Sequence, residues 1–485
     1  MSGTEITRRS LLTHGSLLAG TPFLPFLREC SPGSGGPAGD LGGYGPLVER
    51  PGALIHLPRG FEYVAFSPTG DRMSDGRRVP GAHDGMRAFS VDGMPHVVRL
   101  VRNHELGGVS VSQGPAHLSY DPTAPGAVTI VDFDTQRRRV IRSFLALSGT
   151  IENCAGGYGG RGNRSWLSCE ESTEGLAAGY QQKHGYVFEV SADSKGLVTP
   201  VPLKAMGRFT HEAAERDDRT GIVYLTEDEG PDGFYRFLPN DKNDLTRGGS
   251  LWMLAVDGQP EYDTSKGQVP GVVLETHWVQ IGHPDPEDAE ENPLSVLQQG
   301  YAKGAASFAA LEGLYLRDGI AYFSASEGGD AERGQIWQYT PIDLNRGNLK
   351  LVYESSDKDV LDGPDNICLS PKGSVLIAED GDGSEWIDGD DSCRVAGDNY
   401  VRFVTRDGVA YDFAKVPKSV DLVLEDFDDF EEDCTADPLP GPGEIFGASE
   451  TAGVVFSPDG KWLFLNIQTP GITLAITGPW HKGAL

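Results

Sequence analysis

The chain has 485 residues, of which 38% are hydrophobic, and its formal net charge at pH 7 is −30. The apolar content excludes extensive disorder, and the negative field disfavours nucleic acid and anionic lipid as partners while it favours divalent cations. We therefore expect no nucleic-acid binding. We also expect no stable membrane association, since no run approaches the roughly 20 apolar residues that span a bilayer.

The N-terminal segment, residues 1–46, resembles a twin-arginine export signal followed by a flexible stretch. Arg8 and Arg9 stand directly before a weakly apolar stretch, and residues 31–46 are rich in Gly, Ser and Pro. Such a signal is not part of the fold. It predicts passage through the twin-arginine translocase to the periplasm or the exterior. Because these substrates cross already folded, it also favours a metal inserted before export.

Residues 47–485 repeat one pattern: a turn, a short β-branched and aromatic strand, and a polar, often acidic, end. The instances are residues 97–105, 165–171, 221–228, 319–327, 373–380 and 461–468. With 64 glycines and 32 prolines there is little room for long helices, and we expect only a short one within residues 293–306. Weak alternation within each run indicates strands buried on both faces.

The spacing of these strands suggests the architecture. They begin about 50 to about 100 residues apart, which favours a radial array with loop insertions over a regular solenoid. We predict an all-β fold, a six-bladed β-propeller forming a single domain over residues 47–485. A pair of all-β sandwiches is the alternative that the pattern leaves open.

The cysteines offer one candidate metal ligand. Six in a chain of this size are too few for a disulfide scaffold, and their pairing cannot be deduced from sequence. Cys154 lies in a turn and is the candidate ligand. The buried thiols or bridge partners are expected among Cys169, Cys368, Cys393 and Cys434.

The candidate metal-binding carboxylates lie at the ends of four of the six strands. If these strands are equivalent, their ends converge on one mouth of a central channel. The carboxylates concerned are Glu105, Glu170, Glu171, Glu227, Asp228, Glu379 and Asp380. Crowded carboxylates stay ionised only when cations lie among them, and hard oxygen ligands select Ca²⁺ or Mg²⁺. The other interpretation, that they cap turns or face solvent, holds for most single cases.

Further polar clusters precede the strands. Arg208 and Glu212 lie before the third strand, Glu312 before the fourth and Asp365 before the fifth. A thiolate such as Cys154 among carboxylates would make a softer site, suited to iron or zinc. Arg208 is a natural partner for an anion held by such metals.

The ensemble of motifs resembles the PhoX-type alkaline phosphatases. The resemblance covers roughly residues 50 to 475 and rests on Asn103-His104-Glu105, Asn153-Cys154-Ala155-Gly156-Gly157, Cys169-Glu170-Glu171, Gly207-Arg208-Phe209, His211-Glu212-Ala213, Thr226-Glu227-Asp228, Leu311-Glu312-Gly313, Pro364-Asp365-Asn366 and Glu379-Asp380-Gly381. It implies a propeller with an iron and calcium cluster at the channel mouth that hydrolyses phosphomonoesters outside the cytoplasm.

The resemblance also implies roles for individual residues. Cys154, Glu212 and Glu312 would ligate an Fe³⁺ pair, with Arg208, Glu212 and Glu312 as the catalytic residues. Ca²⁺ would be held or bridged by Glu170, Glu171, Glu227, Asp228, Asp365, Glu379 and Asp380. The substrate would be a small phosphorylated molecule.

The chain departs from the family pattern at one informative position. Typical members carry an arginine two residues before the Glu-Gly pair, where it helps to hold the phosphate, and here that residue is Ala310. Arg161 or Arg164 could take its place from a loop. Two further functions stay open: another metal-dependent hydrolase on the same fold, such as a phosphodiesterase or lactonase, and a non-catalytic binding propeller.

Overall fold

The computed structural model describes residues 42–50, 52–160, 164–381, 385–386, 394–395, 399–417 and 450–485. The chain divides into compact units of residues 1–36 and 37–485, and every described residue belongs to the second. The arginine pair of the predicted export signal lies outside the described residues, as do Arg161, Cys393 and Cys434. Among the described helices, none has both the length and the apolar character needed to cross a membrane.

Two antiparallel sheets follow one another after the first short strands. The first has the order β4 (His83–Ser90), β5 (Val97–His104), β6 (Gly126–Asp134) and β7 (Arg139–Thr150). The second has the order β8 (Gly157–Gly160), β9 (Ser165–Cys169) and β10 (Val187–Ser191). Every residue of β5, β6 and β9 is buried, which explains why these runs alternate so weakly.

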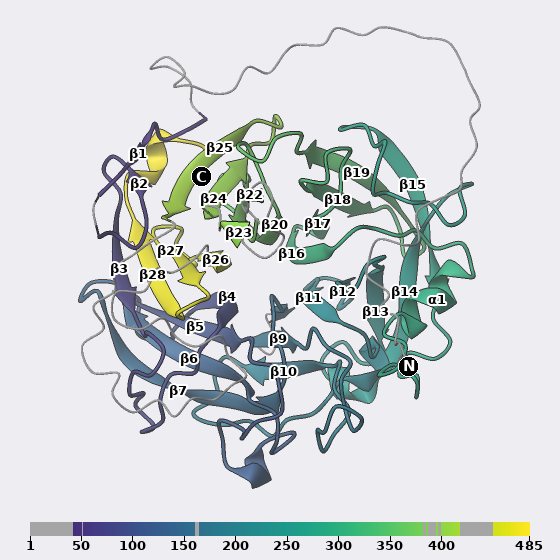
Figure 1. Cartoon of the computed structure of the whole chain (residues 1–485), viewed down its shortest axis with the longest axis horizontal. Helices are drawn as coiled ribbons and strands as arrows, with labels where there is room; N and C mark the ends of the chain where they lie inside the picture. Colours follow the sequence, from purple (N-terminus) through teal and green to yellow (C-terminus); the bar gives the residue numbers. More distant parts are fainter. Residues whose placement is uncertain are drawn as a thin grey trace, which may run out of the picture. The chain divides into compact units, whose positions relative to one another are not determined.

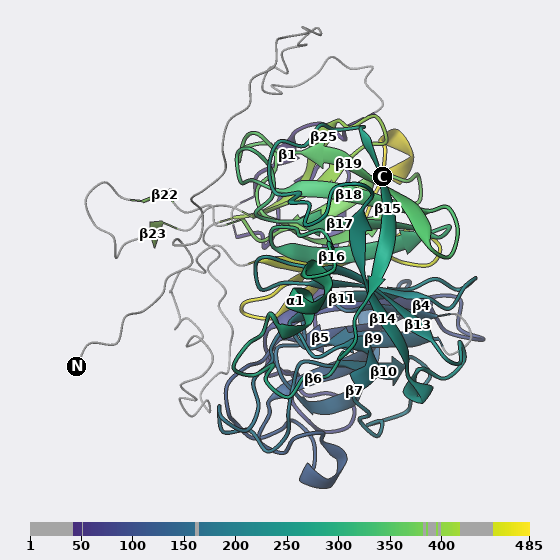
Figure 2. The same ribbon diagram turned by 90° about the vertical axis from the view of Figure 1, so that its right-hand side faces the viewer.

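A nine-stranded sheet forms the next part of the unit. Its strands are, in spatial order, β11 (His211–Arg216), β12 (Val223–Glu227), β13 (Phe234–Pro239), β14 (Gly249–Val256), β15 (Val273–Gln280), β19 (Arg346–Glu354), β18 (Gln335–Pro341), β17 (Ile320–Ala325) and β16 (Leu311–Arg317). The antiparallel pairing of β15 with β19 joins its two halves. Figure 2 shows β19, β18, β17 and β16 following one another in this order.

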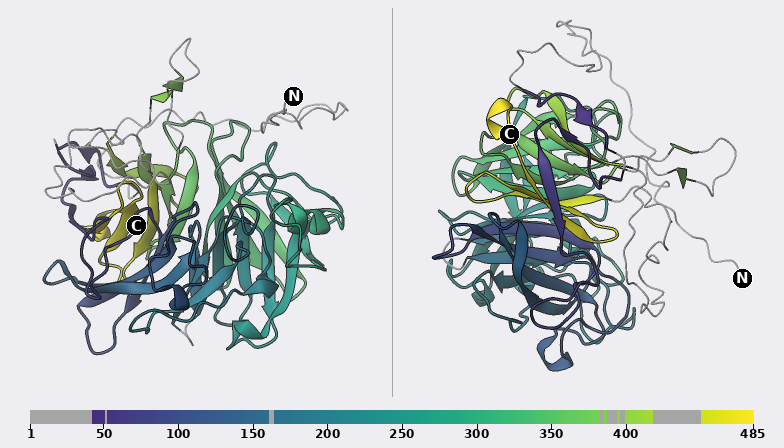
Figure 3. Two further views of the ribbon diagram at one scale, coloured as in Figure 1. Left: turned by 60° about the horizontal axis from the view of Figure 1, so that its bottom comes forward. Right: turned by 90° about the vertical axis from the view of Figure 1, so that its left-hand side faces the viewer.

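Two four-stranded sheets complete the arrangement. One consists of β20 (Pro364–Leu369), β21 (Val375–Glu379), β24 (Asn399–Val404) and β25 (Ala410–Val416). The other consists of β26 (Thr451–Phe456), β27 (Leu463–Ile467), β28 (Ile472–Thr477) and β3 (Glu62–Phe66). Because β3 pairs with β28, a strand from the start of the unit closes the sheet that ends it (Figure 3).

The remaining elements are short. Two-stranded ribbons pair β1 (Leu47–Val48) with β2 (Leu57–Pro58) and β22 (Glu385–Trp386) with β23 (Arg394–Val395). The short helix expected within residues 293–306 is α1 (Ser295–Tyr301). The 3₁₀ turns are η1 (Ala116–Leu118), η2 (Lys204–Met206), η3 (Leu245–Arg247) and η4 (Trp480–Lys482).

The large sheets of this unit are arranged around a common centre (Figure 1). Their first strands form a closed ring of contacts, in the order β4, β8, β11, β16, β20, β26 and back to β4, where β11 and β16 are the two edge strands of the nine-stranded sheet. The hydrophobic core is divided among the spaces between neighbouring sheets: Phe66, Leu100 and Phe464 share one cluster, and Phe144, Trp166 and Phe188 share the next. The fold is therefore all-β and propeller-like, as the sequence predicts.

Candidate metal centre

Four strands of the inner ring carry an acidic residue at the same place, just after their first ladder pair. In β11 the ladder with β12 shifts between His211 and Ala214, so two residues beginning with Glu212 face a single residue of β12. Such a β-bulge re-aims a side chain out of the regular alternation of the strand. The same irregularity brings equivalent residues to the start of β4, β16 and β20, namely Asp84, Glu312 and Asp365.

A thiol takes this place in the sheet of β8. Asn153 forms an isolated bridge with Glu170, and the backbone N–H of Cys154 donates to the Cys169 carbonyl at 3.2 Å. Cys154, Cys169 and Cys368 are all buried free thiols. Of the two states expected for Cys169 and Cys368, buried thiol or bridge partner, both residues thus adopt the first, and Cys154 has a free thiol that can act as a ligand.

Further carboxylates follow the second strand of each sheet, on the other side of the bulge. Glu105 follows β5 directly, Asp228 follows β12 and Asp380 follows β21. Glu171 follows Glu170, which extends the pairing of β9 by one residue through its bridge to Asn153. The predicted convergence of strand ends thus places carboxylates from separate sheets around the ring of first strands.

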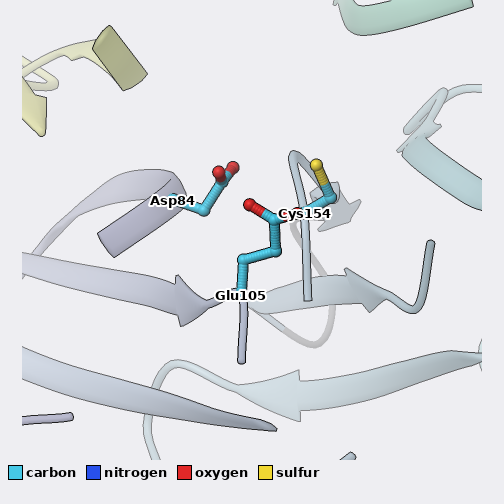
Figure 4. Close-up of side chains that lie close together, drawn as sticks. All are labelled: Asp84, Glu105 and Cys154. Atoms are coloured by element: carbon cyan, nitrogen blue, oxygen red, sulfur yellow. The ribbon is translucent and has the colours of Figure 1, made fainter. Parts of the chain in front are cut away.

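Three overlapping groups of side chains come close enough to bind metal ions. The ligand atoms within each group lie within 4.8 Å of one another, and neighbouring groups share either Cys154 or Glu212. Figure 4 shows the first group, whose three side chains point toward one another. The groups are Asp84–Glu105–Cys154, Cys154–Glu171–Glu212 and Glu212–Glu312–Asp365.

The electrostatics of these groups require positive charge. Burial, and after it the repulsion of neighbouring carboxylates, raises the pKa of six acids in and beside these groups well above the usual value. This holds for Glu105, Glu171, Glu212, Glu312, Asp365 and Glu450. Burial and the nearby Glu212 carboxylate likewise raise the pKa of the Cys154 thiol. Burial and mutual repulsion thus favour the protonated form of these carboxyls, and cations among them would favour the ionised form instead.

The donor set fits metal ions. Both carboxylate oxygens of buried Glu212 lack a hydrogen-bond partner among the described residues, apart from the Cys154 thiol. Buried carboxylate oxygens are normally satisfied by donors or by cations, so a cation beside Glu212 would supply what the described residues do not. Carboxylates suit hard ions such as Ca²⁺, and the thiol adds affinity for a softer ion.

Three predicted ligands, Glu170, Glu227 and Glu379, belong to none of these groups and accept hydrogen bonds from protein donors, although Oε1 of Glu227 has no partner among the described residues. Glu227 accepts hydrogen bonds from the Gly233 N–H at 2.9 Å and the Tyr235 hydroxyl at 2.6 Å, both on its second oxygen. Glu379 accepts from a backbone N–H on each oxygen and forms an ion pair with Arg402 at 2.8 Å. These three glutamates are the first members of the pairs Glu170-Glu171, Glu227-Asp228 and Glu379-Asp380. In each pair the first residue is held by protein donors and the second approaches the cluster.

Glu170 shows this division most clearly. It accepts hydrogen bonds from the backbone N–H groups of residues 151, 185 and 186 and from His184 Nδ1 at 2.7 Å. Asp121 lies 3.6 Å from the other nitrogen of His184. Burial alone would lower the pKa of His184, but the Glu170 and Asp121 carboxylates outweigh it and raise the value to about 9. The imidazolium thus ties residues 121, 170 and 184 together.

Arg208 is hydrogen-bonded to the loop of residues 171–184, which contains His184. Its guanidinium donates to the carbonyl oxygens of Thr173 and His184, both at 2.8 Å, and the side chain is fully buried. One terminal nitrogen, Nη1, has no partner among the described residues. The predicted role as a partner for an anion therefore needs access that this conformation does not provide.

The position of the missing arginine is visible as well. Ala310 has a φ of +49° and its carbonyl accepts the Ser326 N–H at 2.8 Å, next to Glu312. Of its suggested substitutes, Arg164 pairs with Asp193 at 3.2 Å at the opposite end of β9 from Glu171. Arg161 lies outside the described residues.

Sequence reasoning missed several members of the cluster. Asp84 was not singled out, although the signal was present: it is an acid followed by a small residue at the start of an inner strand, as in Glu212-Ala213 and Glu312-Gly313. Glu450 forms side-chain hydrogen bonds with Asp84 and Asp365 that partly offset the rise in pKa which burial causes in both, but no recognisable motif surrounds it in the sequence. Gln468, which donates to Asp84 at 3.2 Å and Glu105 at 2.5 Å, was not singled out either.

Comparison with protein families gives one clear match. The family model described as alkaline phosphatase PhoX matches residues 42–141 and 133–471, which is most of the chain. No curated protein sequence matches the chain.

Solved structures resemble the fold. The structure of Pseudomonas fluorescens PhoX in complex with vanadate, a transition state analogue, has a TM-score of 0.61 and 19% sequence identity, and the match covers 92% of this chain and 99% of that one. The β-propeller domain of Myceliophteria thermophila Cps50 (Swd1) has a TM-score of 0.38 and 11% identity, over 82% and 97% of the two chains. The structure of a luciferin-regenerating enzyme has a TM-score of 0.40 and 10% sequence identity, and the match covers 86% of this chain and 96% of that one.

Proposed function

The chain belongs to the PhoX alkaline phosphatase family, and from this premise we propose that it is an exported, metal-dependent hydrolase of phosphomonoesters. The observation that carries the proposal is the continuous cluster of three ligand groups that share Cys154 and Glu212. Membership of the family makes the protein a phosphatase of the alkaline phosphatase type. The choice of metals, the monoester preference and the export route are the parts that we propose.

The residues divide between two kinds of ion. Because Cys154 is the only sulfur ligand in the three groups, we assign Fe³⁺ to its side of the cluster, with Glu212 and Glu312 completing an iron pair. Carboxylates alone suit Ca²⁺, which would be held by Glu171, Asp228, Asp365 and Asp380, together with Asp84, Glu105 and Glu450. When bound, such cations neutralise phosphoryl oxygens and lower the pKa of water.

Polar neighbours orient the ligands. The Ser326 hydroxyl donates to one oxygen of Glu312 at 2.8 Å, and the Asn366 amide donates to both oxygens of Asp365 at 2.9 and 3.0 Å. Each bond fixes a carboxylate plane before any ion arrives. Support of this kind reduces the reorganisation that binding and catalysis require.

We expect the substrate to approach from the loops that follow the second strands rather than through the centre of the ring. The central cavity is lined by Arg87 and Glu215, which form an ion pair at 2.6 Å. The Arg87 guanidinium lies 4.5 Å from the centre of the Tyr315 ring and 5.1 Å from that of Tyr158. This group of side chains fills the space beside the inner strands beyond the acidic residues.

The same proposal includes the finer points of architecture and location. We count six blades by treating the nine-stranded sheet as two, joined where β15 pairs with β19. The closed ring of six first strands supports this count. The arginine pair at Arg8 and Arg9 supports export by the twin-arginine translocase, which a reporter fused to residues 1–46, with both arginines changed to lysine as the control, would test.

The decisive experiment is a substrate panel combined with elemental analysis. We expect protein purified without added metal to contain iron and calcium and to hydrolyse para-nitrophenyl phosphate. The variant Glu312→Gln should lose activity and part of its metal. Hydrolysis of the bis-ester or of a simple lactone in preference to the monoester would favour another hydrolase, and metal without any hydrolysis would favour a binding propeller.

A further inference from the structure

A second set of polar residues connects neighbouring sheets directly at the cluster, where the two halves of the nine-stranded sheet, β11–β15 and β16–β19, are counted as separate sheets. Each occupies the next-to-last position of a second strand, in β5, β12, β17 and β27, and each is fully buried. Each donates a hydrogen bond from its side chain to a backbone carbonyl of the next sheet. The residues are Asn103, Thr226, Ser324 and Asn466.

The accepting carbonyls all belong to members of the metal-binding groups. Asn103 donates to Cys154 at 2.5 Å, and Asn466 donates to Asp84 at 2.6 Å. The hydroxyl of Thr226 donates to the Glu312 carbonyl at 2.8 Å. The hydroxyl of Ser324 donates to the Asp365 carbonyl at 2.7 Å. In every case the donor lies on one sheet and the ligand side chain on the next.

The bulges explain why a side chain is needed at these places. Where two residues face one, the ladder is locally disrupted and an extra residue is left unpaired. Asp84, Glu312 and Asp365 lie in such bulges, so a donor from the neighbouring sheet can fix the peptide that carries each ligand. A peptide held on only one side could rotate and turn the carboxylate away from the cluster.

The orientation of the two amides is itself determined. The oxygen of the Asn103 amide accepts from Trp166 Nε1 at 2.8 Å and from the Ser168 hydroxyl at 2.9 Å, which directs its nitrogen at Cys154. The oxygen of the Asn466 amide accepts from the Thr473 hydroxyl at 2.6 Å. Neither amide could be reversed without losing donors on one side and creating a clash of acceptors on the other.

Thr226 connects two ligands of one group. Its hydroxyl oxygen accepts the Ala213 N–H at 3.0 Å while its proton goes to the Glu312 carbonyl. Ala213 completes the bulge that presents Glu212. One hydroxyl therefore fixes the relative position of Glu212 and Glu312, two members of the group that also contains Asp365.

We propose that Asn103, Thr226, Ser324 and Asn466 are positioning residues that set the spacing of the metal ligands across the boundaries between sheets. They touch no reacting atom and act through the backbone of the ligands. The inference rests on the proposed function only in that the cluster binds metal, and it holds whatever the substrate is.

The test uses Thr226→Val in the full-length protein, because valine keeps the shape and removes the hydroxyl. Thr276→Val is the matched control: Thr276 is equally buried, in β15, and its hydroxyl has no partner among the described residues. Metal affinity is measured by dialysis against graded chelator followed by elemental analysis. We expect affinity to fall at least tenfold in Thr226→Val, to recover in Thr226→Ser and to be unchanged in the control.

Ser324→Ala serves as a second variant should Thr226→Val fail to fold, with the same expected loss of metal. A merely structural role would instead lower the melting temperature of the metal-free protein and leave metal affinity within twofold of wild type, which would overturn the proposal. Wild-type protein that binds metal but hydrolyses nothing would refute the proposed function alone. Wild-type protein that binds no metal would refute both.

Discussion

Glu170 and Glu171 are adjacent in the chain, yet their carboxylates face different surroundings. Glu170 is enclosed by backbone N–H groups and His184, whereas Glu171 lies with Cys154 and Glu212 in one of the metal-binding groups. Both residues lie just beyond the end of β9, and their carboxylates point to different surroundings, which separates anchor from ligand.

The two glutamates should therefore respond differently to the same substitution. Glu170→Gln removes the nearer of the two carboxylates that face the buried His184 and should reduce stability by about 3 kcal/mol while the metal content of the folded protein is kept. Glu171→Gln should lower metal content with a smaller effect on the stability of the metal-free form. Thermal unfolding and elemental analysis of both variants check this, and equal metal loss in the two would contradict the division.

The thiol of Cys154 should give the protein a colour. If it binds iron as a thiolate, the holoprotein absorbs visible light by charge transfer, and Cys154→Ser should remove the band and lower the iron content. Cys368→Ser is the control, because Cys368 is also a buried free thiol but belongs to none of the metal-binding groups. A colourless wild-type protein with a full complement of calcium would exclude the iron assignment.

Metal removal should make stability depend on pH with a definite sign. The pKa values of Glu212, Glu312 and Asp365 are raised in the folded chain by burial and mutual repulsion, so the folded state binds more protons than the unfolded state. Stability must then fall as pH rises above the ordinary carboxyl value of about 4.5.

In excess chelator we thus expect a lower melting temperature at pH 8 than at pH 5.5. Added calcium should raise it by many degrees at pH 8 and by less at pH 5.5, because the ion competes with protons for the same oxygens. A melting temperature unaffected by chelator at both values of pH would remove the argument that cations hold the cluster together.

Arg208 can be tested as an anchor against its predicted role as an anion clamp. Its bonds to the carbonyls of Thr173 and His184 indicate that it fastens the loop of residues 171–184. Arg208→Met should lower the melting temperature by several degrees and change KM for a phosphomonoester by less than twofold. A tenfold rise in KM at unchanged stability would instead support the predicted role of Arg208 in binding the substrate anion.

The absent arginine should limit activity on monoesters. A charge-assisted bond contributes roughly 1.5–3 kcal/mol, so Ala310→Arg should raise kcat/KM for para-nitrophenyl phosphate several-fold or more. The gain is reduced because Ala310 has a positive φ, a backbone conformation that side chains adopt at some expense in stability. Ala310→Gln, similar in reach but neutral, is the control and should give no gain; high native activity that Ala310→Arg impairs would show that another group holds the phosphate.

Much of the architecture could be read from the chain alone. Short apolar strands with polar ends, repeated at irregular spacing in a chain rich in glycine and proline, predicted an all-β radial fold, because such strands can be buried only between neighbouring sheets. The accumulation of Glu and Asp at strand ends predicted a cation site. These inferences rest on local pattern and composition, which sequence displays directly.

Which carboxylate faces the cluster was decided only in three dimensions. Glu170, Glu227 and Glu379 have the same local context as their neighbours, and the backbone donors that hold them come from segments that sequence does not place beside them. Asp84 and Glu450 join the cluster because the ring closes between β26 and β4, which brings together residues more than 350 positions apart. The sequence determined that acids and a thiol would gather at strand ends, and the closure of the sheets and the bulges in their first strands determined which of their atoms meet.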